Sequence, residues 1–432
     1  MELFILSLFC ISLFLCLLFN LSILIGLCFG FILFNLYGLY KGYSLRELLH
    51  FSLEGIQTVK NILFTFILIG ILTASYRQAG TIAYIVSFAS QFMQPSVFLL
   101  LTFLLNCFIS FLTGTAFGTA ATMGVICLAM GQSMGMPTPL LGGAILAGSY
   151  FGDRCSPIST SALLVASITN TNIYKNIKDM IQSAKIPFII SCILYLIVGF
   201  FFCSHSNIPN MTSIFSNEFN LSIFCTIPMF VLLILSLCKV ETKKSMTLSI
   251  LSALFIILWI QKTPINALPK LFIFGFSANH SEVAKLLNGG GIQSMVKVFA
   301  IVCLSSAYAG LFKRTGLLLG IQSKVNKLSQ KTNSYMSILI ISILTGIIAC
   351  NQTLTIMLTK QLTLNLKEDK MYALYLEDSA VVISPLIPWS IAGAVPLASV
   401  NAPTLSIVFA FFLYLLPIYQ IISSRHSIDS KE

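Results

Sequence analysis

The sequence contains very little charge. Only 9% of its 432 residues are Asp, Glu, Lys or Arg, whereas an ordinary soluble domain has about 25%, and 57% are hydrophobic. Such a chain has too few polar side chains to cover a water-facing surface. Its apolar runs reach the roughly 20 residues that a helix needs to cross a bilayer, and they lack the alternation of barrel strands. The sequence therefore predicts an all-α polytopic membrane protein with about 10 to 13 transmembrane segments.

Motifs of several functional classes are also missing. The chain has no phosphate-binding loop and no H-E-x-x-H sequence, so we expect neither an enzyme nor a cofactor. None of the 12 cysteines belongs to a C-x-x-C pair, which argues against a metal centre or a disulfide framework. The Lys and Arg residues that give the chain its net charge of +11 are expected to lie in cytoplasmic loops. No nucleic-acid partner is expected, because no basic soluble module is present.

The hydrophobic runs divide the chain into consecutive parts. Membrane spans are expected near 3–19, 21–36, 61–76, 96–113, 184–203, 221–238, 246–261, 294–312, 333–350 and 403–422. The parts are an N-terminal transmembrane hairpin (1–36), a cytoplasmic linker (37–60), repeat one (61–203), a connector with two transmembrane helices and an external loop (204–293), an inverted repeat two (294–422) and a polar tail, expected to be disordered (423–432). Regions 114–168 and 351–400 are rich in Gly, Pro, Ser and Thr, which predicts broken or re-entrant helices.

An internal repeat relates the two halves. The matched positions are Arg77 with Lys313, Gly80 with Gly316, Asp153 with Asp378, and Ser156-Pro157 with Ser384-Pro385. The first two pairs share a separation of 236 residues, and the later pairs follow a loop of different length. Arg77 and Lys313 are expected to mark span ends and to extend toward the membrane surface.

The distribution of Lys and Arg predicts the orientation of the repeats. Residues 77–95 carry one positive residue, whereas residues 313–331 carry five. Positive loops face the cytoplasm, so we expect the repeats to be inverted copies, an architecture typical of secondary transporters. The same rule places both termini in the cytoplasm.

Two pairs of charged residues mark the candidate site. Asp153-Arg154 and Glu377-Asp378 lie at matching positions of the broken regions. A charge at the bilayer centre costs about 2.5–3.5 kcal/mol and normally faces a protein interior or water. We expect an ion site with Asp153 and Asp378 as central carboxylates, which bind Na+ transiently, and Glu377 in support. Further oxygen donors are expected from Ser156, Ser159, Thr160, Ser161, Thr115, Asn351 and Ser384.

A carboxylate in such a site can bind either a proton or a cation. Removal from water favours the protonated form of a carboxyl group, so the two ions compete for it and exchange follows. The alternative is structural, with the charged pairs forming interhelical salt bridges. Arg154 also has two readings: a tether that keeps Asp378 or Glu377 ionised, or a bidentate clamp for a substrate carboxylate.

At these residues the sequence resembles the NhaC-type sodium/proton antiporter family. The motif G-T-x-[FW]-G-T is matched by residues 114–119, and F-G-D-[KR]-x-S-P-x-S is matched by residues 151–159. In the second half, Asn351-Gln352 and the L-E-D-S…S-P-L-I-P-W stretch at 376–389 match the family. The resemblance implies cation/proton exchange across the plasma membrane by an inverted-repeat carrier of a kind that often dimerises. The family also includes malate/lactate exchangers.

One position departs from the family motif. Members commonly have an acidic residue directly after S-P-x-S, where this chain has Thr160. The expected function is Na+/H+ antiport through a shared carboxylate site, and the alternative is a Na+- or H+-coupled exchanger of a small carboxylate or amino acid. A third hypothesis, from a different functional class, is a channel or a non-transporting membrane scaffold. The expected partners are Na+, H+ and the lipid bilayer, and a homodimer is left open.

Overall fold

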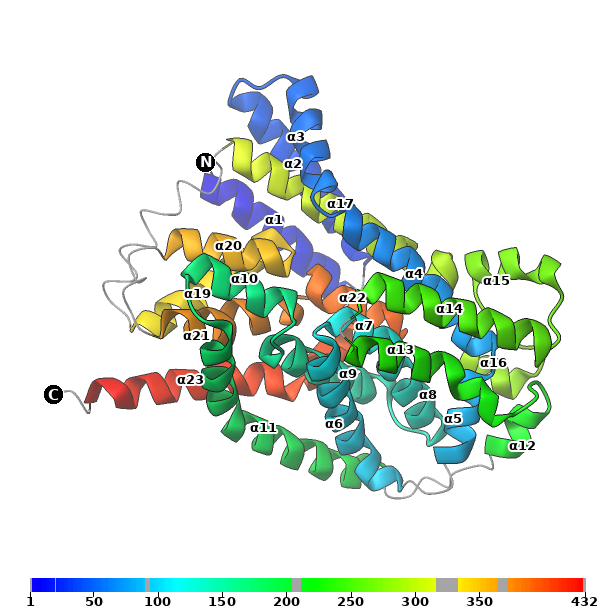
Figure 1. The fold of residues 1–432 in the computed structure, drawn as a ribbon. Coiled ribbons are helices and arrows are strands. Elements are labelled where there is room, and N and C mark those ends of the chain that lie inside the picture. Colours follow the sequence, from blue (N-terminus) through cyan, green and yellow to red (C-terminus); the bar gives the residue numbers. More distant parts are fainter. Residues whose placement is uncertain are drawn as a thin grey trace.

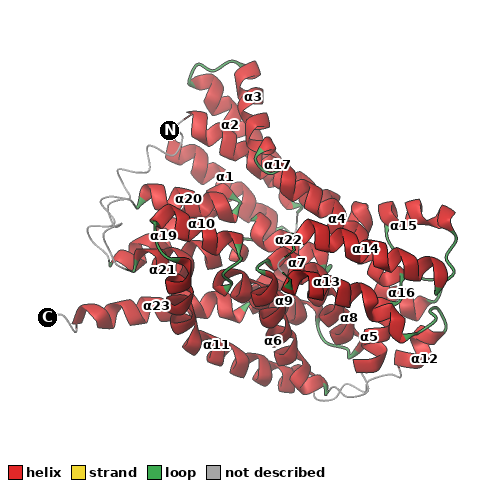
Figure 2. Cartoon of the chain, viewed as in Figure 1, coloured by secondary structure: helices red, strands yellow, loops and turns green. Residues whose placement is uncertain are grey.

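Helices make up nearly all of the regular structure. The computed structural model describes residues 2–19, 21–89, 94–203, 211–238, 240–315, 333–363 and 371–429. Within these ranges no strand is formed, and one isolated β-bridge joins Phe276 to Gly289 (Figures 1 and 2). The predicted all-α fold class is confirmed.

Several helices are suited to crossing a membrane. In the described part of the chain five helices are long and apolar enough, or up to seven if each bent helix pair is one span. The five are α2 (Ile23–Tyr40), α6 (Pro95–Thr113), the run of α7 (Ala116–Thr119), η1 (Ala120–Gly124) and α8 (Val125–Ser133), α11 (Ile173–Cys203) and α17 (Gly291–Thr315). One bent pair is α4 (Lys60–Gln78) with α5 (Thr81–Ala89), which meet at an angle of 58°.

Helices also occupy the remaining expected spans. They are α1 (Glu2–Leu18), α13 (Ile227–Leu237), α14 (Thr242–Trp259), α19 (Ser334–Ala349) and α23 (Phe411–Asp429). The expected total of about 10 to 13 crossings therefore includes helices shorter than a full span. Outside the expected spans, the amphipathic helix α3 (Leu45–Gln57) lies between α2 and α4.

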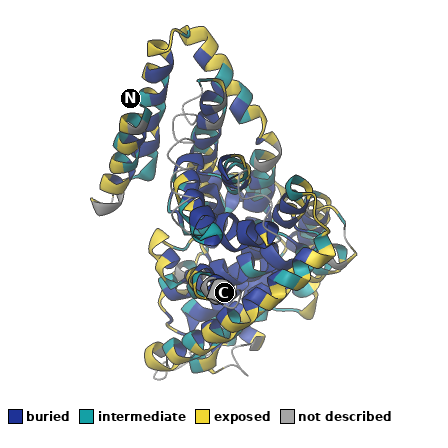
Figure 3. Ribbon diagram, turned by 90° about the vertical axis from the view of Figure 1, so that its left-hand side faces the viewer, coloured by how far each residue is buried: buried dark blue, intermediate teal, exposed yellow. Residues whose placement is uncertain are grey.

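The outer helices expose large apolar side chains. On α11, Ile189 is 57% exposed, Ile193 50% and Phe201 83%. Figure 3 shows such exposed residues on the outer helices and buried residues in the centre. A soluble protein does not expose so continuous an apolar surface, which agrees with a multi-pass membrane protein.

The two halves contain the same kind of helix break. Helix α6 ends at Gly114 with φ +65°, and Thr115 then caps the start of α7. In the second half α19 ends at Cys350 with φ +55°, and Asn351 caps α20 (Gln352–Leu362). A left-handed residue stops a helix, and a side-chain oxygen on the next residue starts another. These breaks lie 236 residues apart, in agreement with the proposed repeat, whose domain boundaries stay predictions.

A second break in each half lies at the centre of the fold. Helix α9 (Thr138–Cys155) stops at Ser156, and α10 (Thr160–Thr169) begins after Ser159. In the second half α21 (Tyr372–Leu376) continues as the π-helix η5 (Glu377–Val381) and the 3₁₀ turn η6 (Ser384–Leu386). The chain then bends by 55° into α22 (Ile391–Ser399). A π-helical turn is rare and frequently marks a functional site.

Small residues bring α9 against α6. A Cβ atom at Gly148 would lie 2.6 Å from the carbonyl oxygen of Phe103, and one at Gly152 would lie 2.2 Å from the backbone nitrogen of Phe111. Only glycine permits this approach, which is how membrane helices pack closely. Because Gly152 is next to Asp153, this packing also fixes the backbone of the candidate site.

The structure shows short helices in one expected loop and corrects two expectations about helix ends. The polar connector after residue 262 contains η3 (Ile265–Ala267), α15 (Leu268–Phe274) and α16 (Ser281–Leu287). Helix α23 continues to Asp429, so the expected disordered tail is wrong for residues 423–429. Arg77 does end α4 but is only 7% exposed, so its expected extension to the surface is wrong. The positive residues Lys324, Lys327 and Lys331 and the repeat position Gly316 lie outside the described residues.

Candidate functional site

Four charged side chains meet where α9 and η5 lie together. Asp153 and Arg154 are in the last turn of α9, while Glu377 and Asp378 begin η5. Arg154, Glu377 and Asp378 are 0% exposed, and Asp153 is 5% exposed. The tertiary structure therefore unites the two charged pairs that the sequence placed in separate broken regions.

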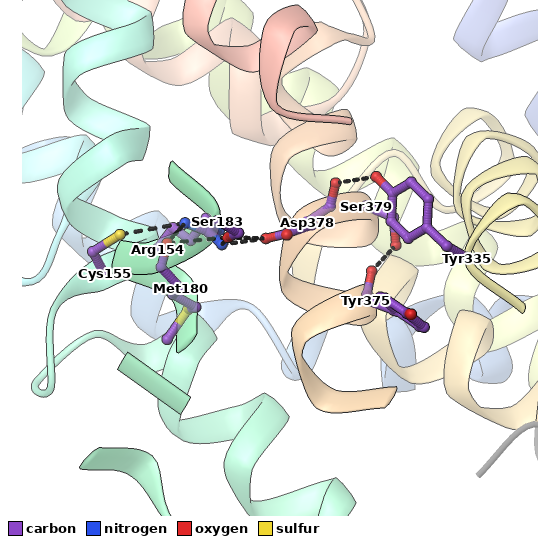
Figure 4. Close-up of polar contacts among 8 residues, drawn as sticks. All are labelled: Arg154, Cys155, Met180, Ser183, Tyr335, Tyr375, Asp378 and Ser379. Atoms are coloured by element: carbon purple, nitrogen blue, oxygen red, sulfur yellow. Dashed lines mark hydrogen bonds and ion pairs between the residues drawn. The ribbon is translucent and has the colours of Figure 1, made fainter. Parts of the chain in front are cut away.

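The Arg154 guanidinium holds three elements together. Its Nη2 forms the ion pair with Asp378 Oδ1 and also donates to Ser183 Oγ on α11 at 2.9 Å. Its Nη1 donates to the carbonyl oxygen of Met180, also on α11, at 3.0 Å. Figure 4 shows Arg154 directed from α9 toward Asp378 on η5. Because nearly all of its donors point at protein atoms, Arg154 fixes η5 relative to α9 and α11.

Helix α19 supports η5 from the side opposite Arg154. The Tyr335 hydroxyl donates to the backbone oxygen of Asp378 at 2.9 Å, and the Ser342 hydroxyl donates to Ser379 Oγ at 3.0 Å (Figure 4 shows the first contact). Ser379 in turn donates to the carbonyl oxygen of Tyr375 at 2.6 Å. The bonds to the Asp378 and Tyr375 carbonyl oxygens satisfy backbone groups that a π-helix leaves misaligned.

Glu377 has no such partner. It is fully buried, and neither of its carboxyl oxygens has a hydrogen-bond partner among the described residues. It lies within electrostatic range of Asp153, Arg154 and Asp378. Asp378 Oδ2 also has no hydrogen-bond partner in the described structure. An ionised carboxylate in this setting costs several kcal/mol unless a proton or a cation joins it.

Asp153 lies in a cluster of hydroxyl groups. Ser159 Oγ donates to Asp153 Oδ1 at 3.1 Å, and Ser161 Oγ donates to Oδ2 at 3.0 Å. The side chain of Gln352, on α20, and the backbone N–H of Ala116, on α7, also reach this carboxyl group. The first turns of α7 and α20 therefore converge on Asp153, and helix N-termini favour negative charge.

Most of the other predicted oxygen donors have local roles. Thr115 and Asn351 accept backbone N–H groups as helix caps, and Ser384 Oγ donates to the carbonyl oxygen of Ala380 at 2.7 Å. Ser156 is buried, and its hydroxyl oxygen accepts the N–H of Ile158 at 3.4 Å. Thr160 is exposed, so it does not share the buried surroundings of Asp153.

The sequence interpretation missed two residues of the site. Ser183 contacts Arg154, and Tyr335 contacts η5. Both lie on long apolar helices, where a single hydroxyl carries no recognisable pattern. Their burial beside a charge becomes evident only when α11 and α19 are placed around η5.

In the described ranges no three His, Cys, Asp or Glu side chains come close enough to hold a metal ion together. A cation at Asp153 would instead meet one carboxylate and neutral oxygens of hydroxyl and carbonyl groups. Such hard oxygen donors suit a weakly held alkali cation that arrives and leaves as cargo.

A multi-span helical protein with buried charges between broken helices defines a class, the secondary membrane carriers. The model of the Na+/H+ antiporter family matches residues 3–172 and 148–426, so nearly the whole chain is covered. The chain belongs to the Na+/H+ antiporter family, a family of transporters. The predicted relationship to NhaC-type antiporters is confirmed.

Three relatives illustrate the range of this family. The chain is 28% identical to the malate-2H+/Na+-lactate antiporter of Bacillus subtilis over 87% of its own length and 82% of the relative's. It is 25% identical to the Na+/H+ antiporter NhaC of Alkalihalophilus pseudofirmus, over 89% and 86% of the two chains. It is 24% identical to the arginine/ornithine antiporter ArcD of Halobacterium salinarum, over 87% and 80%.

Proposed function

We propose that this protein exchanges Na+ for H+ across the plasma membrane through the buried carboxyl groups of Asp153, Glu377 and Asp378. The charge balance of the site carries the proposal. The site holds three carboxyl groups and one guanidinium, and all four groups are buried. With every group ionised the site would hold two uncompensated negative charges. Burial makes such charges costly, so the site takes up monovalent cations, either protons or Na+.

Asp153 is the proposed Na+ ligand. Its neighbours Ser159 and Ser161 each have one proton and two lone pairs. They donate to the carboxylate in the observed arrangement, at 3.1 and 3.0 Å. Rotation of the same hydroxyl protons would turn oxygen lone pairs toward a cation beside Asp153. Protonation of Asp153 removes the charge that attracts Na+, so one group serves both ions in turn.

Arg154 is proposed to act as a tether. Its guanidinium is engaged by Asp378, Ser183 and the Met180 carbonyl, so a substrate carboxylate would have to displace Asp378. The ion pair offsets one of the three negative charges. The other two, on Glu377 and Asp153, are then available to bind and release protons or Na+.

The broken helices supply the proposed path for movement. The site lies between segments from both halves, and transporters of this architecture move one repeat against the other around a fixed site. The bend of 55° between η6 and α22 and the helix break at Ser156–Ser159 are suitable hinges. The distribution of Lys and Arg supports cytoplasmic termini.

Exchange of a small carboxylate or amino acid is the second candidate function. It is favoured by the relatives named for malate, lactate and arginine exchange. In that case the solute would open the Arg154–Asp378 pair, and transport would depend on Arg154 as strongly as on Asp153.

Proteoliposomes with a trapped pH dye test both functions. We expect added Na+ to move protons in wild-type vesicles and in Asp179→Asn, a matched control at a half-buried carboxyl group on α11. Asp153→Asn should abolish the response while the protein stays folded. Ser161→Ala should raise the Na+ concentration for half-maximal rate by about tenfold, the effect of one lost contact to a charged group.

Two results would reject the main proposal. One is the absence of any proton movement with Na+, Li+ or K+ in wild-type vesicles. The other is normal turnover of Asp153→Asn. Counterflow of labelled malate, lactate or arginine in the same vesicles would instead support the second candidate, and its absence would dismiss that candidate.

A further inference from the structure

Arg77 is a second buried guanidinium, and it lies outside the carboxylate site. It occupies the last turn of α4 and is 7% exposed. Its Nε has no hydrogen-bond partner, and the described residues provide no ion pair or charge interaction for it. Arg154, by contrast, is neutralised by Asp378.

An unpaired buried guanidinium demands an anion. Arginine cannot lose its proton in a protein, so burial leaves a full positive charge that is costly without a counter-ion. The carbonyl groups at the end of α4 favour a cation through the helix dipole, but that partial charge does not replace a hydrogen-bonded anion. The carboxylate of Glu218, in the neighbouring connector, is engaged by the backbone N–H groups of Asn279 and His280 at 2.9 and 3.0 Å.

The end of Arg77 faces a run of glycines. A Cβ atom would lie 2.9 Å from Arg77 Nη1 if placed on Gly290, and 3.2 Å if placed on Gly289. Gly289, Gly290 and Gly291 have φ angles of +118°, +77° and +75°. The hydroxyl oxygen of Thr73, also on α4, would lie 3.0 Å from the same Cβ atom on Gly290, and the β-bridge from Phe276 to Gly289 joins the run to the residues just after α15.

The glycine run leads directly into a long helix. Helix α17 begins at Gly291 and has 25 residues. The first N–H groups of a helix have no partner within the helix and carry a partial positive charge, which together form a common anion-binding arrangement. The unpaired Arg77 guanidinium is directed at the residues immediately before this N-terminus. Two independent sources of positive potential therefore meet at one place.

We propose that a small anion, a carboxylate or a halide, binds between the Arg77 guanidinium and the N-terminus of α17. The burial of Arg77 restricts the ligand to a small ion. The anion links the end of α4 to the start of α17, so it stabilises this side of the protein. The proposal goes beyond Na+/H+ exchange, since it concerns an anion and uses none of the carboxylate-site residues.

Thermal unfolding of the purified full-length protein in neutral, lipid-free detergent tests this site. Sodium HEPES, whose sulfonate anion is bulky, is replaced stepwise by sodium chloride or sodium lactate at constant pH and Na+ concentration. We expect a saturable rise in Tm for wild type and for Arg46→Gln, a control that removes an exposed arginine on α3. Arg77→Gln should lose the rise.

The two anions distinguish the source of the ligand. A rise with lactate alone identifies a carboxylate site, and a rise with chloride alone identifies a halide site. If Arg77→Gln does not fold, Arg77→Lys keeps the charge without the planar fork and should shift the midpoint at least tenfold. The absence of a rise in wild type, or an unchanged rise in both Arg77 variants, would overturn the proposal. The readout involves no transport, so it stands apart from the test of Na+/H+ exchange.

Discussion

The ion pair between Arg154 and Asp378 leads to the sharpest prediction. Asp378→Asn keeps the shape of the side chain but removes its charge. Arg154 then remains fully buried and charged, and its remaining hydrogen-bond partners among the described residues are Ser183, the Met180 carbonyl and the Cys155 sulfur. Loss of one member of a buried pair typically costs about 3–5 kcal/mol. We therefore expect the unfolding equilibrium to shift by about a hundred- to several thousandfold.

A second substitution separates this cause from general damage. Arg154→Met removes the stranded charge, and replacing a buried pair by uncharged residues is often neutral or stabilising. The double variant should therefore regain more than about 2 kcal/mol relative to Asp378→Asn, a coupling expected of residues in direct contact. We also expect the double variant to be inactive in transport, because it lacks one of the three carboxyl groups.

Equilibrium unfolding in mixed micelles, followed by far-ultraviolet circular dichroism, measures these differences. Asp179→Asn on α11 serves as the matched control and should stay within about 0.5 kcal/mol of wild type. The reasoning is refuted if Asp378→Asn falls in the range of this control. It is equally refuted if adding Arg154→Met brings no recovery.

The remaining predictions concern packing and capping. Gly152→Ala should lower stability by about 3 kcal/mol, the upper range for overpacking, because its Cβ would lie 2.2 Å from the backbone nitrogen of Phe111; a thermal scan equal to wild type would contradict this. Asn351→Ala should cost about 1 kcal/mol through loss of a helix cap, whereas Asn351→Asp should cost less, as measured by denaturant unfolding. In the capping box of α3, the backbone N–H and hydroxyl of Ser44 hold the pKa of Glu47 below its ordinary value of 4.5. This stabilisation is present above pH 4.5 and is lost as the pH falls through the lowered pKa; amide exchange at the start of α3, corrected for intrinsic rates, should show the loss in wild type and not in Glu47→Gln.

The helix breaks were readable from the sequence because local chemistry causes them. Gly114 accepts a positive φ without strain, and the oxygens of Thr115 and Asn351 cap the helices that follow. The corresponding stop at Cys350 also has a positive φ, although cysteine gives no such signal. Its conformation is imposed by the surrounding structure, as the backbone bond from Ile391 to the Cys350 carbonyl at 2.8 Å indicates.

The roles of the predicted donors depended on side-chain direction. The sequence grouped Ser159, Thr160 and Ser161 as equivalent hydroxyls, yet Ser159 and Ser161 contact Asp153 while Thr160 is exposed. Ser159 caps α10, and Thr160 is the first residue of that helix. Neighbouring residues at a helix start point in different directions. The position of Thr160 next to the motif therefore did not show that its side chain belongs to the site.

The low charge content by itself determined that this chain lies in a membrane, and the charges that remain identified where its site must be. Both conclusions follow from the cost of moving charge out of water, which depends on residue type alone. The tertiary structure decided the partners. It joined Arg154 to Asp378 rather than to Glu377, added Ser183, and gave Arg77 no acidic partner among the described residues. Such pairings form between helices that are distant in the chain. They depend on side-chain distances of a few ångströms, which the spacing of residues in the sequence does not determine.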